Sequence, residues 1–235
     1  MSLRLTIPHY YDFGVDRPEV GDELASPGAW DGLRTRTDGP FAMAATLDEW
    51  HEQARAHPEL RYRAEEVAAT CDQLEINSLA SYGVGGAVLE QWLSRSAPHL
   101  ELTVTEYAPD TVARLREFFP DATVSHHDLL RDSPVPAEVH LFHRIDTEFS
   151  NRQLRDAMRR FESSTMIVVA GQLIGLREAY QELRKRRNPQ ASRAGVSRNR
   201  AAFDALWKQT HQAEAVSFHD LPGWILRPRS AHRPR

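Results

Sequence analysis

Three features in the middle of the chain could together hold a nucleotide-like ligand. Gly83, Gly85 and Gly86 lie in a glycine turn between an apolar run and an amphipathic segment. Glycine lets the backbone approach a ligand closely at the N-terminus of a helix. Glu106, 20 residues after Gly86, ends the next apolar run, where a carboxylate can accept hydrogen bonds from both hydroxyls of a ribose. Asp128, 22 residues further on, could accept a hydrogen bond from an adenine amino group.

Each of these features also has a plainer interpretation. The glycines could form only a tight turn, Glu106 could be a surface acid at a strand end, and Asp128 could cap a turn or helix. Together, however, they fall at the carboxyl ends of three consecutive predicted strands. Such ends meet at one edge of a parallel sheet, where open α/β sheets bind their ligands. The combination therefore favours a binding site.

The elements that would position these residues alternate between strands and helices. Apolar runs predict strands over 74–80, 100–105, 122–125, 139–142 and 165–170. Three helices are predicted to begin at the capping boxes at Thr46 and Ser150 and at Pro109. Further helices are predicted over 61–71, 87–95, 173–187 and 203–211. Two short final strands, 216–219 and 224–226, are joined by only four residues and must form an antiparallel hairpin. Residues 1–45 and 188–200 are predicted to be loop-like.

At this point the sequence resembles the class I S-adenosylmethionine-dependent methyltransferases, over about residues 61–228. The segment SLASYGVGGAVLEQWL looks like the first motif of that family, and LTVTEYAPDTVARLREFFPDATVSHHDLL resembles the segment that grips ribose and adenine. VHLFHRIDTEFSNRQLRDAMRRF looks like the fourth strand with its helix, and VSFHDLPGWILRP like the terminal hairpin. The resemblance implies a Rossmann-like α/β three-layer sandwich. Its mostly parallel seven-stranded sheet would have the order 3-2-1-4-5-7-6 and an antiparallel last strand.

The resemblance also implies a cofactor, S-adenosylmethionine, and the residues that would contact it. These are Ser81, Tyr82, Gly83, Gly85, Glu106, Tyr107, Asp128 and Leu129. This sequence has Leu79 and Ser81 where the family usually has an acid, which orients the methionine moiety, and the first glycine. Asn77 or Glu75 could substitute for the acid. We therefore expect the adenosine half of the site to be better kept than the methionine half.

Methyl transfer is an in-line displacement in which the protein mainly positions the nucleophile and excludes water. A base is needed only for a protonated acceptor. The candidate for this base is His143, at the end of the fourth strand, and Asp146 could orient its ring. His126 and His127 are second choices for the base. No pattern of metal ligands is present.

Three regions are expected: an N-terminal extension over 1–60 that could form an acceptor-site lid, a methyltransferase-like domain over 61–228, and a basic tail over 229–235. Aromatic residues of the extension, including Trp30 and Trp50, suit an apolar small-molecule acceptor, although they could equally pack the extension onto the domain. The single cysteine, Cys71, excludes an internal disulfide, and no apolar run is long enough to span a membrane. A cytoplasmic location is the default expectation.

Three alternatives remain beside a small-molecule methyltransferase. A dinucleotide oxidoreductase is disfavoured because the third glycine of Gly-x-Gly-x-x-Gly is missing. A protein of this fold that no longer methylates, as a scaffold, partner subunit or other enzyme, would explain Leu79 and Ser81. An RNA methyltransferase would explain why residues from Arg184 onward carry 12 Lys and Arg against three Asp and Glu. Nucleic acid is nevertheless disfavoured, because 184–200 contain no aromatic residue for base stacking.

Overall fold

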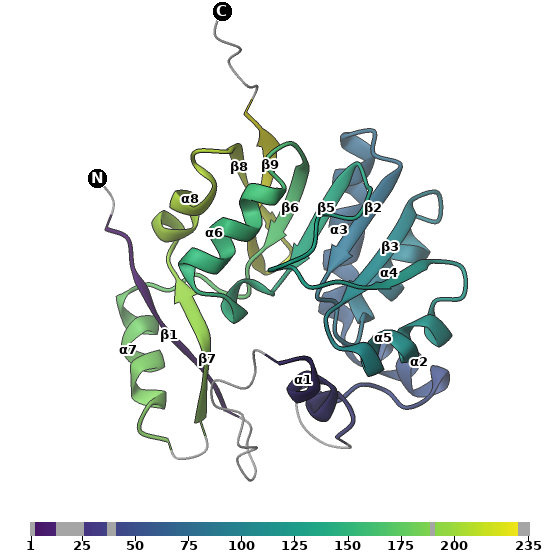
Figure 1. Cartoon of the computed structure of the whole chain (residues 1–235), viewed down its shortest axis with the longest axis horizontal. Coiled ribbons are helices and arrows are strands. Elements are labelled where there is room, and N and C mark those ends of the chain that lie inside the picture. Colours follow the sequence, from purple (N-terminus) through teal and green to yellow (C-terminus); the bar gives the residue numbers. More distant parts are fainter. Residues whose placement is uncertain (1–2, 13–25, 37–40, 189–190, 230–235) are drawn as a thin grey trace, which may run out of the picture.

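The computed structural model describes residues 3–12, 26–36, 41–188 and 191–229 (Figure 1). Its centre is a seven-stranded sheet with the spatial order β4-β3-β2-β5-β6-β9-β8. The strands of this main sheet are β2 (Ser78–Tyr82), β3 (Glu101–Glu106), β4 (Thr123–His126), β5 (Val139–His143), β6 (Thr165–Val169), β8 (His211–Phe218) and β9 (Leu221–Pro228).

The topology of the main sheet confirms the predicted fold class. Strands β4, β3, β2, β5 and β6 pair in parallel, whereas β9 is antiparallel to both β6 and β8. Counted within this sheet, the order is the expected 3-2-1-4-5-7-6. The hairpin turn is tighter than predicted, because the second strand begins at Leu221 rather than at Trp224.

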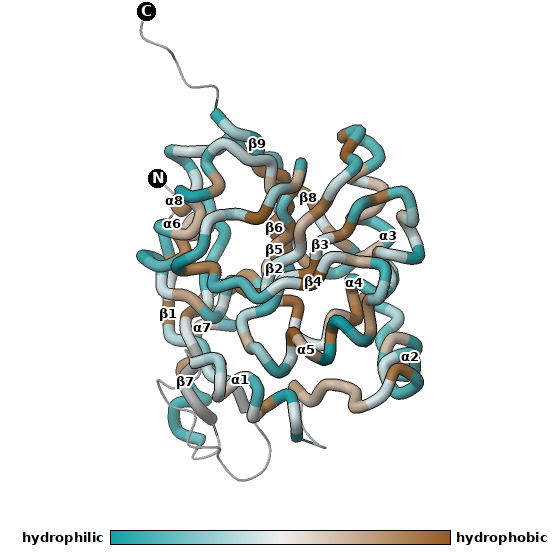
Figure 2. Tube along the Cα trace, turned by 45° about the vertical axis from the view of Figure 1, so that its right-hand side comes forward, coloured by the Kyte–Doolittle hydropathy of each residue, from teal (hydrophilic) through white to brown (hydrophobic). Residues whose placement is uncertain are grey.

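Helices cover both faces of the main sheet, and each face has its own apolar core. The helices are α1 (Pro27–Arg34), α2 (Leu47–Ala56), α3 (Pro58–Gln73), α4 (Val88–Ser96), α5 (Pro109–Phe118), α6 (Asn151–Arg160), α7 (Leu176–Lys185) and α8 (Arg200–Trp207). One core joins the strands to α2, α3, α4 and α5, and the other joins them to α6 and α8. The hydrophobic colouring in Figure 2 accordingly gathers on the central strands between the helices.

The two segments predicted to be loop-like contain a second sheet. Strand β1 (Thr6–Asp12) pairs antiparallel with β7 (Ala191–Arg198), and α7 packs beside β1 (Figure 1). The prediction was wrong because neither segment shows a local strand pattern. Pro8 precedes a shift in the β1 register, and β7 is polar with Gly195 in its middle. Each strand is stabilised by a partner about 180 to 190 residues away in the sequence, which local patterns do not reveal.

Close packing holds β7 against the main domain. Gly195 has a φ of +94°, and a Cβ atom there would lie 1.7 Å from the carbonyl oxygen of Thr147. Thr147 belongs to a short 3-10 turn, η2 (Asp146–Glu148), that follows β5. Arg198, at the end of β7, is completely buried and donates hydrogen bonds to the carbonyl oxygens of Asp146 and Phe149. Gly195, which has no side chain, and the buried guanidinium of Arg198 thus fix the position of the β1–β7 sheet on the main domain.

Within the part of the chain that the structure describes, no helix combines the length and the apolar character needed to cross a membrane.

Candidate functional site

The glycine turn after β2 has the backbone geometry that only glycine adopts easily. Gly83 and Gly85 have φ values of +64° and +57°, in the left-handed region. The N–H groups of Gly83 and Val84 donate to the carbonyl oxygen of Thr105, which holds the turn against the end of β3. Trp50 supports the turn from outside, since its indole Nε1 donates to the carbonyl oxygen of Gly86 at 2.8 Å. Helix α4 begins directly after this turn.

Glu106 joins the end of β3 to the glycine turn. Its Oε2 accepts a hydrogen bond from the Gly85 N–H at 2.6 Å, and its Oε1 accepts from the N–H groups of Tyr107 and Ala108 at 2.8 and 3.2 Å. The side chain is only 6% exposed, so the interpretation as a surface acid is wrong. A buried carboxylate fixed by three backbone donors is a rigid acceptor for hydroxyl groups at this edge.

A surface hollow of about 530 Å³ lies at the ends of β3 and β4. It is lined by Ser26, Pro27, Tyr107, His126, Asp128, Arg131 and Asp132. Asp128 Oδ1 accepts a hydrogen bond from the Leu130 N–H at 2.8 Å, so the aspartate also caps its own turn, as its plainer interpretation predicted. Burial raises the pKa of Tyr107, and the charge of Asp128 adds to this effect. The hollow therefore presents both an aromatic ring and a carboxylate.

Three of the expected cofactor contacts turn their side chains away from the hollow. The Ser81 hydroxyl donates to Glu90 Oε1 at 2.7 Å on the α4 side of the sheet. Tyr82 is 1% exposed in the opposite core, where its hydroxyl accepts from the Val135 N–H and lies 3.2 Å from His140 Nδ1. Leu129 is buried in that same core. Alternation along β2 causes the first two placements, so these residues offer a ligand backbone groups rather than side chains.

His143 and Asp146 do not form the expected pair. Arg144 between them has a φ of +59°, which turns the chain sharply after β5. Asp146 is buried, and its Oδ1 accepts a hydrogen bond from the Gly171 N–H at 3.1 Å. Burial raises the pKa of Asp146, and the Gly171 hydrogen bond and the nearby Arg198 and His9 of the small sheet oppose that rise. The prediction that Asp146 orients His143 is therefore wrong.

His143 lies on the α3 side of the sheet, near an ion pair between Arg63 and Asp220. Arg63 Nη2 is 2.7 Å from Asp220 Oδ1. Burial, followed by the charges of Arg144 and Arg63, lowers the pKa of His143 to about 3. Its Nε2 is buried and has no hydrogen-bond partner among the described residues. The imidazole is therefore neutral at physiological pH and can accept a hydrogen bond, but it holds a proton poorly.

The second-choice histidines differ in their environments. His126 is exposed and lines the hollow, with its ring 6.2 Å from that of Tyr107. His127 is buried against the ring of Tyr82 at 4.9 Å, and burial lowers its pKa. Only His126 therefore faces the hollow.

Comparison with solved structures identifies the fold. The chain superposes on the mitomycin 7-O-methyltransferase MmcR with a TM-score of 0.59 at 19% identity, over 72% of this chain and 54% of that one. It matches human N-acetylserotonin methyltransferase, solved with S-adenosylmethionine, with a TM-score of 0.60 at 13% identity, over 78% and 56% of the two chains. TnmH gives 0.62 at 18% identity, over 89% and 64%.

The chain has the class I methyltransferase fold. The match covers little more than half the length of the mitomycin and human enzymes. No protein-family model and no curated protein matches the sequence.

Glu90 is the residue of this methyltransferase fold that sequence reasoning missed. It lies in the first turn of α4, is 2% exposed and accepts the hydrogen bond from Ser81. Burial raises its pKa to about 7, and the nearby charge of Glu106 adds to the rise. Asn77 and Glu75 precede β2, at the end of the strand remote from the glycine turn, so neither can replace the missing acid. The sequence signal that could have revealed Glu90 was an acidic residue on the buried face of α4.

Helix α1 brings further residues to the candidate site. Asp31 Oδ1 accepts hydrogen bonds from the Thr111 N–H and hydroxyl at 2.9 and 3.0 Å, which fixes α1 to the N-terminus of α5. Arg34, at the end of α1, lies directly on Gly85. The sequence signal for this helix was Ser26 followed by Pro27, an N-cap with proline at the first helical position. Trp50, in contrast, packs on Phe118 and Phe119, as its plainer interpretation predicted.

Proposed function

We propose that this protein binds S-adenosylmethionine and transfers its methyl group to a small-molecule acceptor. The observation that carries the proposal is the position of Glu106. This buried carboxylate joins β3 to the glycine turn, and its neighbours Tyr107 along the chain and His126 across the sheet both line the hollow that contains Asp128. Acids at these two strand ends are suited to ribose hydroxyls and an adenine amino group. The fold, and the methyltransferases that share it, support the same ligand.

The residues around the turn fit this cofactor. A Cβ atom on Gly86 would meet no other atom within 4 Å, so a ligand can approach the main chain there, next to the guanidinium of Arg34 on Gly85. The carboxylate of Glu106 accepts three backbone hydrogen bonds, and a ribose hydroxyl would share its remaining lone pairs. When bound, the cofactor supplies an electrophilic methyl group on a sulfonium.

The protein itself has to position the acceptor and exclude water. His143 is suited to orient a hydroxyl acceptor, because its Nε2, which has no partner among the described residues, can accept one hydrogen bond. With a pKa of about 3 it is a weak base, so its contribution would be orientation rather than storage of a proton.

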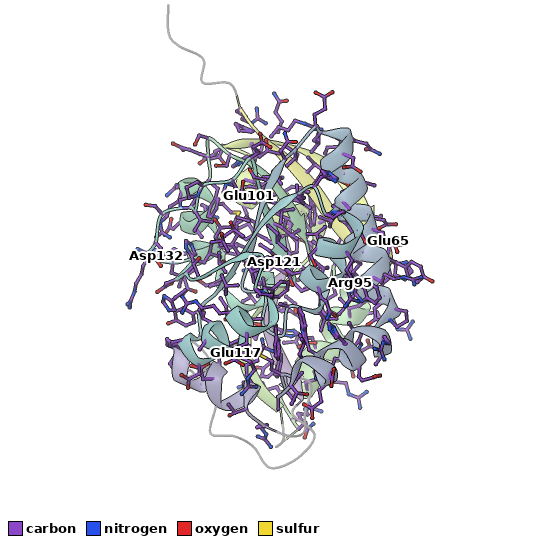
Figure 3. The ribbon with its side chains drawn as sticks, turned by 90° about the vertical axis from the view of Figure 1, so that its right-hand side faces the viewer. Glu65, Arg95, Glu101, Glu117, Asp121 and Asp132 are labelled. Carbon is purple, nitrogen blue, oxygen red and sulfur yellow. The ribbon has the colours of Figure 1, made fainter. Side chains whose placement is uncertain are left out.

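Isothermal titration calorimetry with S-adenosylhomocysteine, the demethylated product, tests the proposal. We expect micromolar binding by the wild type and a loss of roughly 10- to 100-fold in Glu106→Ala, because a charged acceptor for the ribose is removed. Glu101→Ala is the matched control, since Glu101 is exposed at the opposite end of the same strand (Figure 3). Thermal melting establishes that both variants are folded. Absence of wild-type binding, or equal binding by Glu106→Ala, would refute the proposed site.

A second candidate is a protein of this fold that binds the nucleoside but does not methylate. It is favoured by Leu79, which is fully buried where an acid is usual. Incubation with S-adenosylmethionine labelled in its methyl group, against a panel of phenols, alcohols and amines, distinguishes the two. Labelled product establishes the enzyme, whereas tight binding without any product across the panel supports the second candidate.

We favour a small molecule over RNA as the acceptor. The basic C-terminal part of the chain is divided between α7, β7 and the terminal strands, and Arg198 within it is buried. Acidic side chains are distributed over the surface, as Figure 3 shows for Glu65, Glu101, Glu117, Asp121 and Asp132. Filter binding to a generic RNA should therefore fail at low salt; salt-dependent retention would contradict this choice.

A further inference from the structure

We propose that Arg34, from the N-terminal helix α1, binds the carboxylate at the amino-acid end of the cofactor. This inference rests on the proposed function and extends it to the half of the site where the sequence departs from the family. It assigns a ligand-binding role to a segment outside the region of resemblance.

The guanidinium of Arg34 lies on the glycine turn. A Cβ atom built on Gly85 would lie 2.3 Å from Nη2, 2.7 Å from Cζ and 3.1 Å from Nη1 of Arg34. The group thus occupies space that exists only because residue 85 has no side chain. Gly85 is therefore needed both for the left-handed turn and for the close approach of the Arg34 guanidinium.

Several contacts hold this guanidinium in place. Its Nη1 donates to the carbonyl oxygen of Phe41 at 3.0 Å, and its Cζ lies 5.4 Å from the ring of Trp30 and 5.8 Å from that of Phe41. Helix α1 is itself fixed to α5 through Asp31. A guanidinium packed against two aromatic rings that contact each other loses little further side-chain entropy when it binds an anion.

The charges around the turn favour a ligand with a carboxylate. Glu106 accepts a hydrogen bond from the N–H of Gly85, the residue on which Arg34 lies. A cation and a carboxylate at one glycine suit a zwitterion, whose carboxylate would pair with Arg34 and whose ammonium would lie toward Glu106. Guanidinium and carboxylate form paired, parallel hydrogen bonds, which lysine cannot reproduce.

Two product-like probes test this assignment, because they differ in the amino-acid end. S-Adenosylhomocysteine carries the carboxylate and ammonium, whereas 5′-methylthioadenosine has the same adenosine and a thioether without them. We expect Arg34→Ala to weaken S-adenosylhomocysteine binding by roughly 10- to 100-fold and to leave methylthioadenosine binding within about twofold. Arg34→Lys should recover only part of the loss. Calorimetry measures all of these affinities.

Arg95→Ala is the matched control, because it removes the same charge from the exposed C-terminal end of α4 (Figure 3). It should change neither affinity. Equal losses for both probes in Arg34→Ala would overturn the proposal, as would no loss, and tighter binding of both would identify Arg34 as an obstruction instead. Failure of the wild type to bind either probe would refute the proposed function as well. Wild-type binding that Arg34→Ala leaves intact would refute the Arg34 assignment alone.

Discussion

Replacing Glu90 by glutamine should change how the stability of the protein depends on pH. Glutamine keeps the shape and an oxygen that can accept the hydrogen bond from Ser81, but it cannot carry a charge. Burial raises the pKa of Glu90 from 4.5 to about 7, with Glu106 adding to the rise and Ser81 opposing it. Between these two values the folded protein keeps a proton that the unfolded chain has released. The stability of the wild type therefore falls as pH rises through this window.

The size of the effect follows from the two pKa values. The rise of the Glu90 pKa from 4.5 to about 7 corresponds to roughly 3 kcal/mol when both states are fully ionised. Between pH 5 and pH 8 the two-state linkage expression accounts for most of this free energy, about 2 to 3 kcal/mol. The Glu90→Gln variant lacks this term, so its advantage over the wild type should grow by that amount from pH 5 to pH 8.

Urea unfolding at the two pH values measures the effect. The comparison between variant and wild type removes the contribution of other groups. Among them are His140 and His143, whose pKa values are lowered by burial to about 4 and about 3. Their contribution to the free energy of unfolding is lost as pH falls. Glu101→Gln, at an exposed site, should show no such pH-dependent difference. Parallel pH profiles for Glu90→Gln and the wild type would refute the argument that Glu90 is protonated in the folded state.

Three further outcomes follow from buried or strained positions. Gly195→Ala places a methyl group against the Thr147 carbonyl at positive φ, and should cost about 3 kcal/mol in urea unfolding; wild-type stability would contradict the docking of β7. Arg198→Met removes a fully buried cation that donates hydrogen bonds to several oxygens. Calorimetric unfolding should show a loss of roughly 3–5 kcal/mol in stability. A loss under about 1 kcal/mol would contradict the role of Arg198 in fixing β7. Because the pKa of His143 is about 3, the ratio of wild-type to His143→Asn methyl-transfer rates should be constant from pH 6 to pH 9; an acid limb near pH 6.5 present only in the wild type would contradict it.

The residues at the carboxyl ends of the strands were largely predictable. Glu106 and Asp128 follow short apolar runs, and consecutive parallel strands necessarily place such residues at one edge. The glycine turn was equally visible, because positive φ at two nearby positions leaves few alternatives to glycine. The order of the main sheet followed from the family resemblance, and the antiparallel hairpin from its short connection.

Side-chain direction was harder to predict. Tyr82 and Ser81 are neighbours at the right place in the chain, yet one enters the α6 side of the sheet and the other the α4 side. The pairing of His143 with Asp146 failed because the backbone reverses at Arg144, in a conformation that is unusual for arginine.

What the sequence alone determined is the framework: alternating strands and helices, the sheet order through resemblance, and two acids beside a glycine turn. These depend on local periodicity and on short connections along the chain. Only the tertiary structure decided that β1 pairs with β7, that Arg34 rests on Gly85 and that Glu90 lies buried below the turn. These contacts join segments or faces that no local pattern relates, and their free energy comes from burial and charge pairing that exist only once the chain has folded.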